Sequence, residues 1–216
     1  MGRLNFTPLQ KSIFDGFSAK NLARNFYFTG GTALSVFYLH HRISEDMDFF
    51  SEVDFENQLV IDFVTEISKS LNLTYDFTQR YKARVFELQK KGKTKIKIDF
   101  VHYPYKRVEE GIKVDNIFVD SLRDIGGNKL LCINQRTDIK DFVDLYFLLK
   151  KFSIWDLLYV VEAKFRMEMD MVLIASDFAK VEDFKFLPKM LVPLGLSTIK
   201  KFFRDQAKEI GRRIAK

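Results

Sequence analysis

Two aspartates at alternate positions, Asp46 and Asp48, stand in the segment SEDMDFF, and a glycine pair, Gly30-Gly31, precedes them. If the segment forms a short strand, both carboxylates point to one face of it and Met47 to the other. Two carboxylates on one face repel each other, and folding alone does not require such a pair. A pair of bound divalent cations would favour it. The alternative is that both aspartates lie at an exposed strand edge, where they cap a backbone segment or form salt bridges.

A third aspartate, Asp99, ends the segment KTKIKID, in which every other polar position except Thr94 is a lysine. Alternation of Ile96, Ile98 and Phe100 with polar residues predicts a half-buried strand. Three aspartates on two adjacent strands could hold two Mg²⁺ ions, or Mn²⁺, roughly 4 Å apart. Such a metal pair supports in-line phosphoryl or nucleotidyl transfer, with pyrophosphate as the leaving group in the second case.

The glycine pair lies between an aromatic segment, NFYFT, and a helical pattern that begins at Thr32. A strand that opens directly into a helix leaves free backbone N–H groups, which attract an anion such as phosphate. Glycine also permits close approach of the phosphate to the backbone. The segment is not a P-loop, because no Gly-Lys-Ser/Thr follows. An ordinary turn is the alternative for Gly30, Gly31 and Thr32.

These residues resemble a known family. GGTAL followed by HRISEDMDFF is similar to the AbiEii/AbiGii-type toxin nucleotidyltransferases, within the superfamily that shares the DNA polymerase β-like core. The resemblance implies that Gly30, Gly31 and Thr32 hold the triphosphate and that Asp46 and Asp48 hold the metal ions. It implies that Asp99 binds the catalytic metal and helps to deprotonate the incoming hydroxyl.

The resemblance extends into the second half of the chain through Lys129, Arg136, Asp141 and Asp144. It implies that Lys129 contacts the nucleotide phosphates and that the later aspartate belongs to the site. Independently, Asp141 and Asp144 share one helical face through their i, i+3 spacing. The alternatives are acidic residues that favour the helix dipole, and a solvated lysine at position 129.

The activity implied is transfer of a nucleoside monophosphate from a nucleoside triphosphate to an acceptor, with pyrophosphate released. In this family the acceptor can be RNA, at the 3′ end of tRNA, and the enzyme is the toxin of a type IV toxin–antitoxin system with a possible cognate antitoxin. Two other functions remain open: a non-catalytic module that binds nucleotide or protein, and a transferase that acts on a small molecule or a protein. Fold alone does not fix the acceptor.

Periodicity predicts the elements that must position these residues. Strands are expected at residues 25–29, 46–51, 73–78, 83–89, 94–101 and 116–119, with a hairpin turn at Gly92. Helices are expected at 8–20, 32–41, 55–71, 121–135, 138–152, 153–176, 181–192 and 197–214. The expected class is therefore α+β: a polymerase β-like core at residues 1–120, with a mixed sheet flanked by helices, and a helical domain at 121–216. The site is expected in the cleft between them.

The remaining composition favours a cytoplasmic protein. No apolar run approaches the roughly 20 residues of a membrane span, and the N-terminus lacks the apolar region of a secretory signal. The single cysteine, Cys132, excludes an internal disulfide. The net charge of +6 is concentrated in residues 200–216, which hold seven basic and two acidic residues in an amphipathic helical pattern. This segment is either an RNA-binding helix or a docked terminal helix with a solvated basic face.

Overall fold

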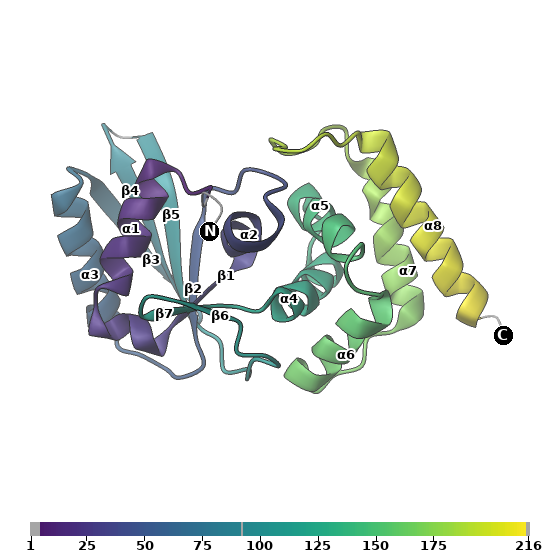
Figure 1. Ribbon diagram of the computed structural model, residues 1–216, viewed down its shortest axis with the longest axis horizontal. Helices are drawn as coiled ribbons and strands as arrows, with labels where there is room; N and C mark the ends of the chain where they lie inside the picture. The colour runs from purple at the N-terminus through teal and green to yellow at the C-terminus, as the bar shows by residue number, and fades with distance from the viewer. Residues whose placement is uncertain (1–4, 92, 215–216) are drawn as a thin grey trace. The chain divides into compact units, whose positions relative to one another are not determined.

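The computed structural model describes residues 5–91 and 93–214, and these divide into two compact units (Figure 1). Unit 1 comprises residues 1–38 and 44–121, and unit 2 comprises residues 39–43 and 122–216. The second unit therefore includes five residues from the first half of the chain. The predicted turn residue Gly92 lies outside the described residues.

Unit 1 is built on a seven-stranded mixed sheet of order β3-β4-β5-β2-β1-β7-β6. The strands are β1 (Tyr27–Thr29), β2 (Met47–Ser51), β3 (Thr74–Arg80), β4 (Ala83–Lys90), β5 (Lys93–His102), β6 (Ile112–Val114) and β7 (Ile117–Val119). Strand β2 runs parallel to β5 and antiparallel to β1. The two strands that carry the predicted carboxylates are therefore direct neighbours, as the sequence predicts.

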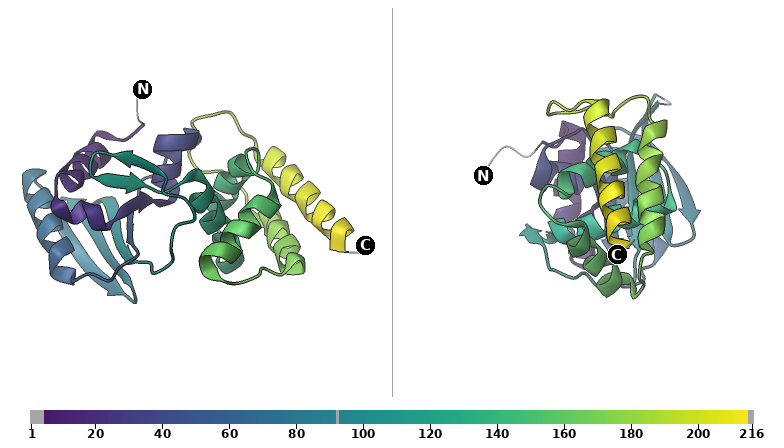
Figure 2. Two further views of the ribbon diagram at one scale, coloured as in Figure 1. Left: turned by 60° about the horizontal axis from the view of Figure 1, so that its bottom comes forward. Right: turned by 90° about the vertical axis from the view of Figure 1, so that its right-hand side faces the viewer.

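Phenylalanines on one face of this sheet form the core of unit 1. Helices α1 (Pro8–Ser18) and α3 (Asn57–Ser70) lie on this face (Figure 2). The ring of Phe17 in α1 lies 4.6 Å from that of Phe49 in β2 and 4.9 Å from that of Phe63 in α3, and Phe49 stacks on Phe100 of β5 at 5.2 Å. Since side chains alternate along a strand, burial of Phe49 and Phe100 turns Asp48 and Asp99 to the opposite face.

The helix after the glycine pair is short and irregular. Helix α2 (Gly30–Ala33) passes directly into η2 (Leu34–Leu39), a π-helical turn, and His40 ends it with a positive φ of 49°. The regular helix expected at 32–41 is therefore shorter and begins at Gly30 itself. The π-helical turn leads the chain into the five-residue segment that belongs to unit 2.

Unit 2 contains the helices α4 (Leu122–Gln135), α5 (Ile139–Leu148), α6 (Ile154–Phe165), α7 (Met171–Ala179) and α8 (Leu196–Ile214), with the 3₁₀ turn η3 (Lys180–Asp183). Gly126 and Gly127 lie within α4 because α6 approaches it closely. A Cβ at these positions would come within 2.7 Å of Leu157 and 2.4 Å of Val160. The glycines that are unfavourable by helix propensity thus permit the α4–α6 contact.

Several predicted elements differ from the observed ones. The helix expected at 153–176 is broken after Phe165, where Arg166 adopts a left-handed conformation and Asp170 caps the next helix. The helix expected at 181–192 was wrong: after Asp183 no helix forms before Leu196, and Pro188 and Pro193 interrupt the helical pattern there. Strand β6 was missed, because three residues beside a turn carry too little periodicity.

Candidate active site

A row of polar side chains crosses the sheet of unit 1 on the face opposite the phenylalanine core. Thr29 pairs with Asp48, and Asp48 with Asp99, so these three residues lie at one level on β1, β2 and β5. At the other side of Thr29, its hydroxyl donates a hydrogen bond of 2.8 Å to the buried Asp120 that follows β7. The structure therefore brings together two of the three predicted metal ligands through strand register alone.

Gly30 lies directly against this row. Its φ is +74°, and a Cβ added there would meet Oδ2 of Asp48 at 2.1 Å. Any other residue would both strain the backbone and displace the carboxylate. The glycine turn and Asp48 are thus parts of one site.

Asp46 precedes β2, and the segment that carries it is held by two side chains. The buried Gln10 of α1 donates from Nε2 to the carbonyl oxygens of Ser44, at 2.8 Å, and Glu45, at 3.1 Å. The hydroxyl of Thr32 donates to the carbonyl oxygen of Asp46 itself. The Thr32 hydroxyl therefore joins the glycine turn to the backbone of Asp46. The Asp46 side chain itself is 46% exposed.

Lys97 brings a positive charge to the carboxylates. Its Nζ lies 3.0 Å from Oδ2 of Asp99 and 3.9 Å from Oδ2 of Asp46. Burial opposes the charge on Lys97, but Asp99 and Asp46 outweigh it and raise the pKa of the ammonium. All three aspartates therefore face one polar region of the sheet.

Asp99 carries an incomplete set of partners. Its Oδ1 is buried and has no hydrogen-bond partner among the described residues. Burial raises the pKa of Asp99, and Lys97 offsets this effect only in part. A buried carboxylate oxygen without a partner is costly, so Asp99 favours the arrival of a further cation.

The donor set suits a hard divalent cation, since Mg²⁺ prefers carboxylate oxygens. As the side chains stand, however, no group of three or more His, Cys, Asp or Glu residues within 5–91 and 93–214 has the spacing of a metal site. The ammonium of Lys97 lies near two of the three carboxylates and supplies the positive charge that a metal ion would supply there. The residues fit the metal by chemistry and by register, and their closure around it would displace Lys97.

The predicted residues of the helical half form a buried ionic cluster in unit 2. Asp144 is fully buried and accepts hydrogen bonds from Arg42 Nε at 2.6 Å and Nη2 at 2.8 Å, and His41 Nε2 lies 2.7 Å away. Lys129 Nζ lies 2.6 Å from Asp144 and 2.7 Å from Asp141. The structure thus brings Lys129, Asp141 and Asp144 together, as expected from their motif.

The charges of this cluster are matched within it. Despite burial, Lys129 and Arg42 hold the pKa of Asp144 far below its usual range, and Asp144 and Asp141 raise that of Lys129. Burial lowers the pKa of His41, so the neutral ring donates its Nε2–H to Asp144. Lys129 is 7% exposed, which excludes the alternative of a solvated lysine.

Five residues of these two clusters were not predicted from sequence. Gln10, Lys97 and Asp120 support the row in unit 1, and His41 and Arg42 complete the cluster in unit 2. Asp120 directly follows the predicted strand at 116–119, and Arg42 belongs to the HRIS motif, so both carried a signal. Gln10 and Lys97 carried none, because a glutamine in a helix and a lysine in a strand are common on surfaces.

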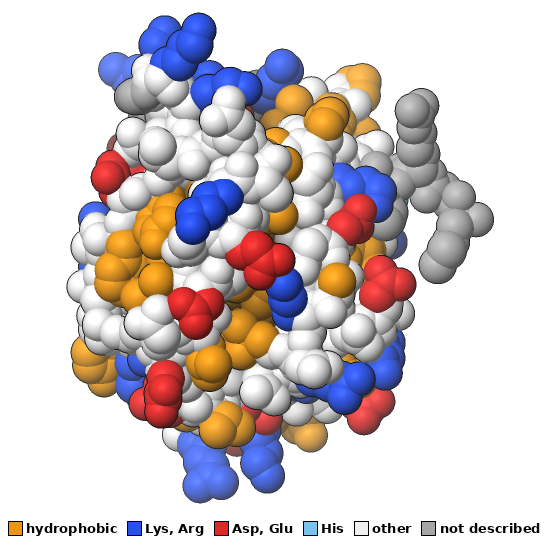
Figure 3. Space-filling view, turned by 90° about the vertical axis from the view of Figure 1, so that its left-hand side faces the viewer, with side chains coloured by type: hydrophobic (Ala, Val, Ile, Leu, Met, Phe, Trp, Pro, Cys, Tyr) orange, Lys and Arg blue, Asp and Glu red, His pale blue; other side chains and the backbone are white. Residues whose placement is uncertain are grey.

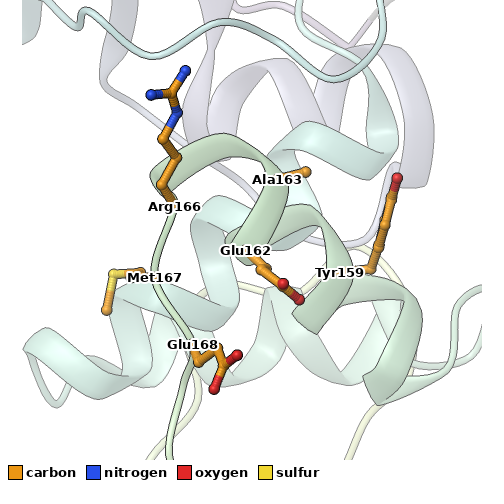
Figure 4. Close-up of a pocket in the computed structure, with 6 residues that line it drawn as sticks. All are labelled: Tyr159, Glu162, Ala163, Arg166, Met167 and Glu168. Carbon is orange, nitrogen blue, oxygen red and sulfur yellow. The ribbon is translucent and has the colours of Figure 1, made fainter.

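A hollow of about 500 Å³ lies elsewhere in unit 2, along the end of α6 and the segment that follows it. It is lined by Tyr159, Glu162, Ala163, Arg166, Met167 and Glu168. Figure 4 shows these side chains pointing in different directions rather than converging on one point. The hollow therefore lacks the features of a catalytic site.

A mixed sheet with a glycine turn and aligned aspartates defines the nucleotidyltransferase class. Two solved structures share the fold. The Helicobacter pylori protein JHP933 is 18% identical with a TM-score of 0.60, covering 96% of this chain and 90% of that one. MenT4, a nucleotidyltransferase toxin of Mycobacterium tuberculosis H37Rv, is 14% identical with a TM-score of 0.53, covering 93% and 82%.

The family model described as "Nucleotidyl transferase AbiEii toxin, Type IV TA system" matches residues 12–212. The chain belongs to this family and is a nucleotidyltransferase. An uncharacterized protein of Aquifex aeolicus (strain VF5) is 29% identical over 207 residues, which cover 93% of this chain and 95% of that protein. Membership of the family implies a nucleoside triphosphate substrate and an antitoxin partner. Among the described residues, no helix is both long enough and apolar enough to cross a membrane.

Proposed function

We propose that this nucleotidyltransferase moves a nucleoside monophosphate from a nucleoside triphosphate to the 3′ end of an RNA, in a reaction that needs Mg²⁺. One observation carries the proposal: Asp48 and Asp99 are paired across neighbouring strands, and Gly30 lies against Asp48 where any side chain would collide. The turn that we propose binds phosphate is thus in direct contact with a carboxylate that we propose binds metal. A structural turn would not require that contact.

In this proposal Asp46, Asp48 and Asp99 hold the metal ions, and Gly30, Gly31 and Thr32 receive the triphosphate on their backbone N–H groups. The bound ions would polarise the transferred phosphate and lower the pKa of the attacking hydroxyl. Asp99 would help to deprotonate that hydroxyl, as the family resemblance implies. Lys97 would leave the carboxylates as the metal ions bind, and its ammonium would then be available to the substrate.

In unit 2 the family resemblance assigns Lys129, Asp141 and Asp144 to nucleotide binding. Lys129 would contact a nucleotide phosphate, as the family resemblance implies. Its ammonium is held by two carboxylates, so a contact with phosphate requires that one of them be exchanged for a phosphate oxygen. Asp144 is enclosed by Arg42, His41 and Lys129, and we assign it the role of positioning Lys129 rather than of touching the nucleotide.

The proposal is tested by incubating the protein with total RNA and each of the four α-labelled nucleoside triphosphates. We expect Mg²⁺-dependent labelling of RNA that is abolished by Asp48→Asn, because the neutral amide is a much weaker ligand for Mg²⁺ than the charged carboxylate. Asp205→Asn, an exposed substitution in α8, is the matched control and should leave labelling unchanged.

Three outcomes would contradict parts of the proposal. Labelling by a γ-labelled nucleoside triphosphate, with none by the α-labelled ones, would mean phosphoryl transfer. Label in a protein or a small molecule but never in RNA would leave the nucleotidyltransferase standing and reject the RNA acceptor. Full labelling in the presence of EDTA would reject the metal site.

A further inference from the structure

The hairpin between β4 and β5 carries the densest run of positive charge in the chain. Residues 90–97 read KKGKTKIK, with five lysines and no acidic residue. Lys91, Lys93 and Lys95 are all exposed. Figure 3 views the molecule from the left-hand side of Figure 1, and Lys and Arg side chains gather at its upper edge. The adjoining ends of β4 and β5 lie at this edge in Figure 1. The hairpin thus presents a concentrated positive surface.

The lysines of the hairpin tip differ from those of α8 in their partners. Among the described residues, no ion pair involves Lys90, Lys91, Lys93 or Lys95. In α8, by contrast, Lys201 pairs with Asp205 and Arg213 with Glu209, and both Lys200 and Arg204 pair with Glu182. Four basic side chains of α8 thus have acidic partners, and the lysines of the hairpin tip have none among the described residues.

The hairpin lysines also lead toward the proposed catalytic aspartate. Lys97 and Asp99 share one face of β5 and lie 3.0 Å apart. Lys95 and Lys93 precede Asp99 by four and six residues, which places them about 13 and 20 Å from it along the strand. Besides the aspartates of the candidate site, acidic residues near this strand are Glu87, which lies opposite Lys97 in the register of β4 and β5, and Asp76 in β3, which is hydrogen-bonded to Gln89. They lie beside the strand and not at its tip.

We propose that this hairpin is a docking surface for the phosphodiester backbone of a single-stranded nucleic acid, which the lysines lead along β5 toward Asp99. Unpaired lysines bind phosphates with release of counterions, and a row of them follows a backbone without reading its sequence. The inference rests on the proposed function, in which RNA is the acceptor. It differs from the sequence-based alternative in which the C-terminal helix binds RNA.

The test compares two triple variants that remove the same charge. The hairpin variant is Lys91→Gln, Lys93→Gln and Lys95→Gln, and the matched control is Lys201→Gln, Arg204→Gln and Arg213→Gln in α8. Binding of a 5′-fluorescent single-stranded RNA oligonucleotide is followed by anisotropy over a series of salt concentrations, in EDTA and without nucleotide. The measurement is therefore independent of transfer, and circular dichroism checks that both variants fold.

We expect the hairpin variant to bind RNA about tenfold more weakly at low salt, with a salt slope reduced by about 2, as three lost phosphate contacts predict. The α8 variant should change the slope by less than half as much. Equal slopes in the hairpin variant and the wild type would overturn the inference, as would a larger loss in the α8 variant.

Two further outcomes separate this inference from the proposed function. If poly-L-glutamate binds the wild type as tightly as the RNA does, the assignment of the docking surface to nucleic acid is overturned, and an acidic protein becomes the partner. If the wild type binds RNA through the hairpin but transfers no nucleotide to it, the docking surface stands and the proposed RNA-directed transfer fails. If the wild type transfers a nucleotide to RNA and the hairpin variant binds RNA and transfers equally well, the proposed RNA-directed transfer stands and the docking surface fails.

Discussion

Unit 1 and unit 2 each hold a group of aspartates, and the two groups are opposite in electrostatic character. In unit 2 Asp144 is fully buried, with Arg42, Lys129 and His41 within 2.8 Å. In unit 1 the nearest atoms of Lys97 lie 3.0 Å from Asp99 and 3.9 Å from Asp46, and these side chains remain 17% and 46% exposed. The carboxylates of the unit 2 group are matched by basic side chains, whereas those of the unit 1 group are matched only in part by the ammonium of Lys97.

The difference shows how one residue type serves two purposes. Buried carboxylates that are fully paired are held in one geometry and lose that geometry if a partner is removed. Carboxylates that are aligned but incompletely paired keep oxygen atoms available for a ligand. The buried cluster ties residues 41 and 42, which directly follow the glycine-turn helix in the chain, to α4 and α5.

The largest expected effect tests whether the unit 2 cluster is structural. Asp144→Ala leaves Arg42 and Lys129 buried without their shared partner, so we expect a loss of about 3–5 kcal/mol in the free energy of unfolding. Asp48→Asn in unit 1 should change it by less than about 0.5 kcal/mol. Urea denaturation followed by circular dichroism measures both. Equal losses in the two variants would remove the distinction between the groups.

A smaller effect is expected from the lysine of each group. Lys129→Met leaves Asp141 and Asp144 with their arginine partners but without the ammonium between them, and should cost about 2 kcal/mol in stability. Lys97→Met removes a partly exposed partner and should cost about 0–1 kcal/mol. Because Lys97 competes with a cation for Asp99, the same variant should also bind Mg²⁺ more tightly in isothermal titration. A Lys97→Met protein that binds Mg²⁺ more weakly would argue against its role as a stand-in.

The smallest effect concerns the metal itself. At a Mg²⁺ concentration ten times its Kd, binding to the folded state alone should raise the free energy of unfolding by about 1.4 kcal/mol. Thermal unfolding with MgCl₂ and with EDTA detects the shift. Asp99→Asn should abolish the stabilisation by Mg²⁺. Asp144→Asn, in unit 2, should leave the stabilisation by Mg²⁺ in place. A shift that survives Asp99→Asn would place the cation elsewhere.

Local patterns in the sequence predicted much of the site. Alternation of apolar and polar residues placed Asp48 and Asp99 on one face, and the breaks at Gly30 and Gly31 marked the turn. Helix α8 was predicted within one residue of its start, because its apolar stripe is long and regular. The segment 184–192 was wrongly assigned to a helix, since two prolines, at 188 and 193, outweigh the helical spacing of the apolar residues around them.

Patterns could not show which charges meet. Lys129 and Lys97 both stand among apolar residues in their segments, yet one is buried between two aspartates and the other lies at a partly exposed site. The ion pairs of α8 with Glu182 join residues 18 and more positions apart. Neither periodicity nor composition contains such contacts, because they depend on the packing of distant elements.

By itself, the sequence determined the residues of the site and the faces of the strands that carry them, because side-chain direction alternates along any strand whatever its neighbours. Only the tertiary structure decided the state of each charge. It placed β2 beside β5 so that Asp48 lies beside Asp99, and it brought Arg42, 102 residues away in the chain, and Lys129, 15 residues away, to Asp144. The energy of a charge depends on its burial and on its nearest partners, and both are set by packing.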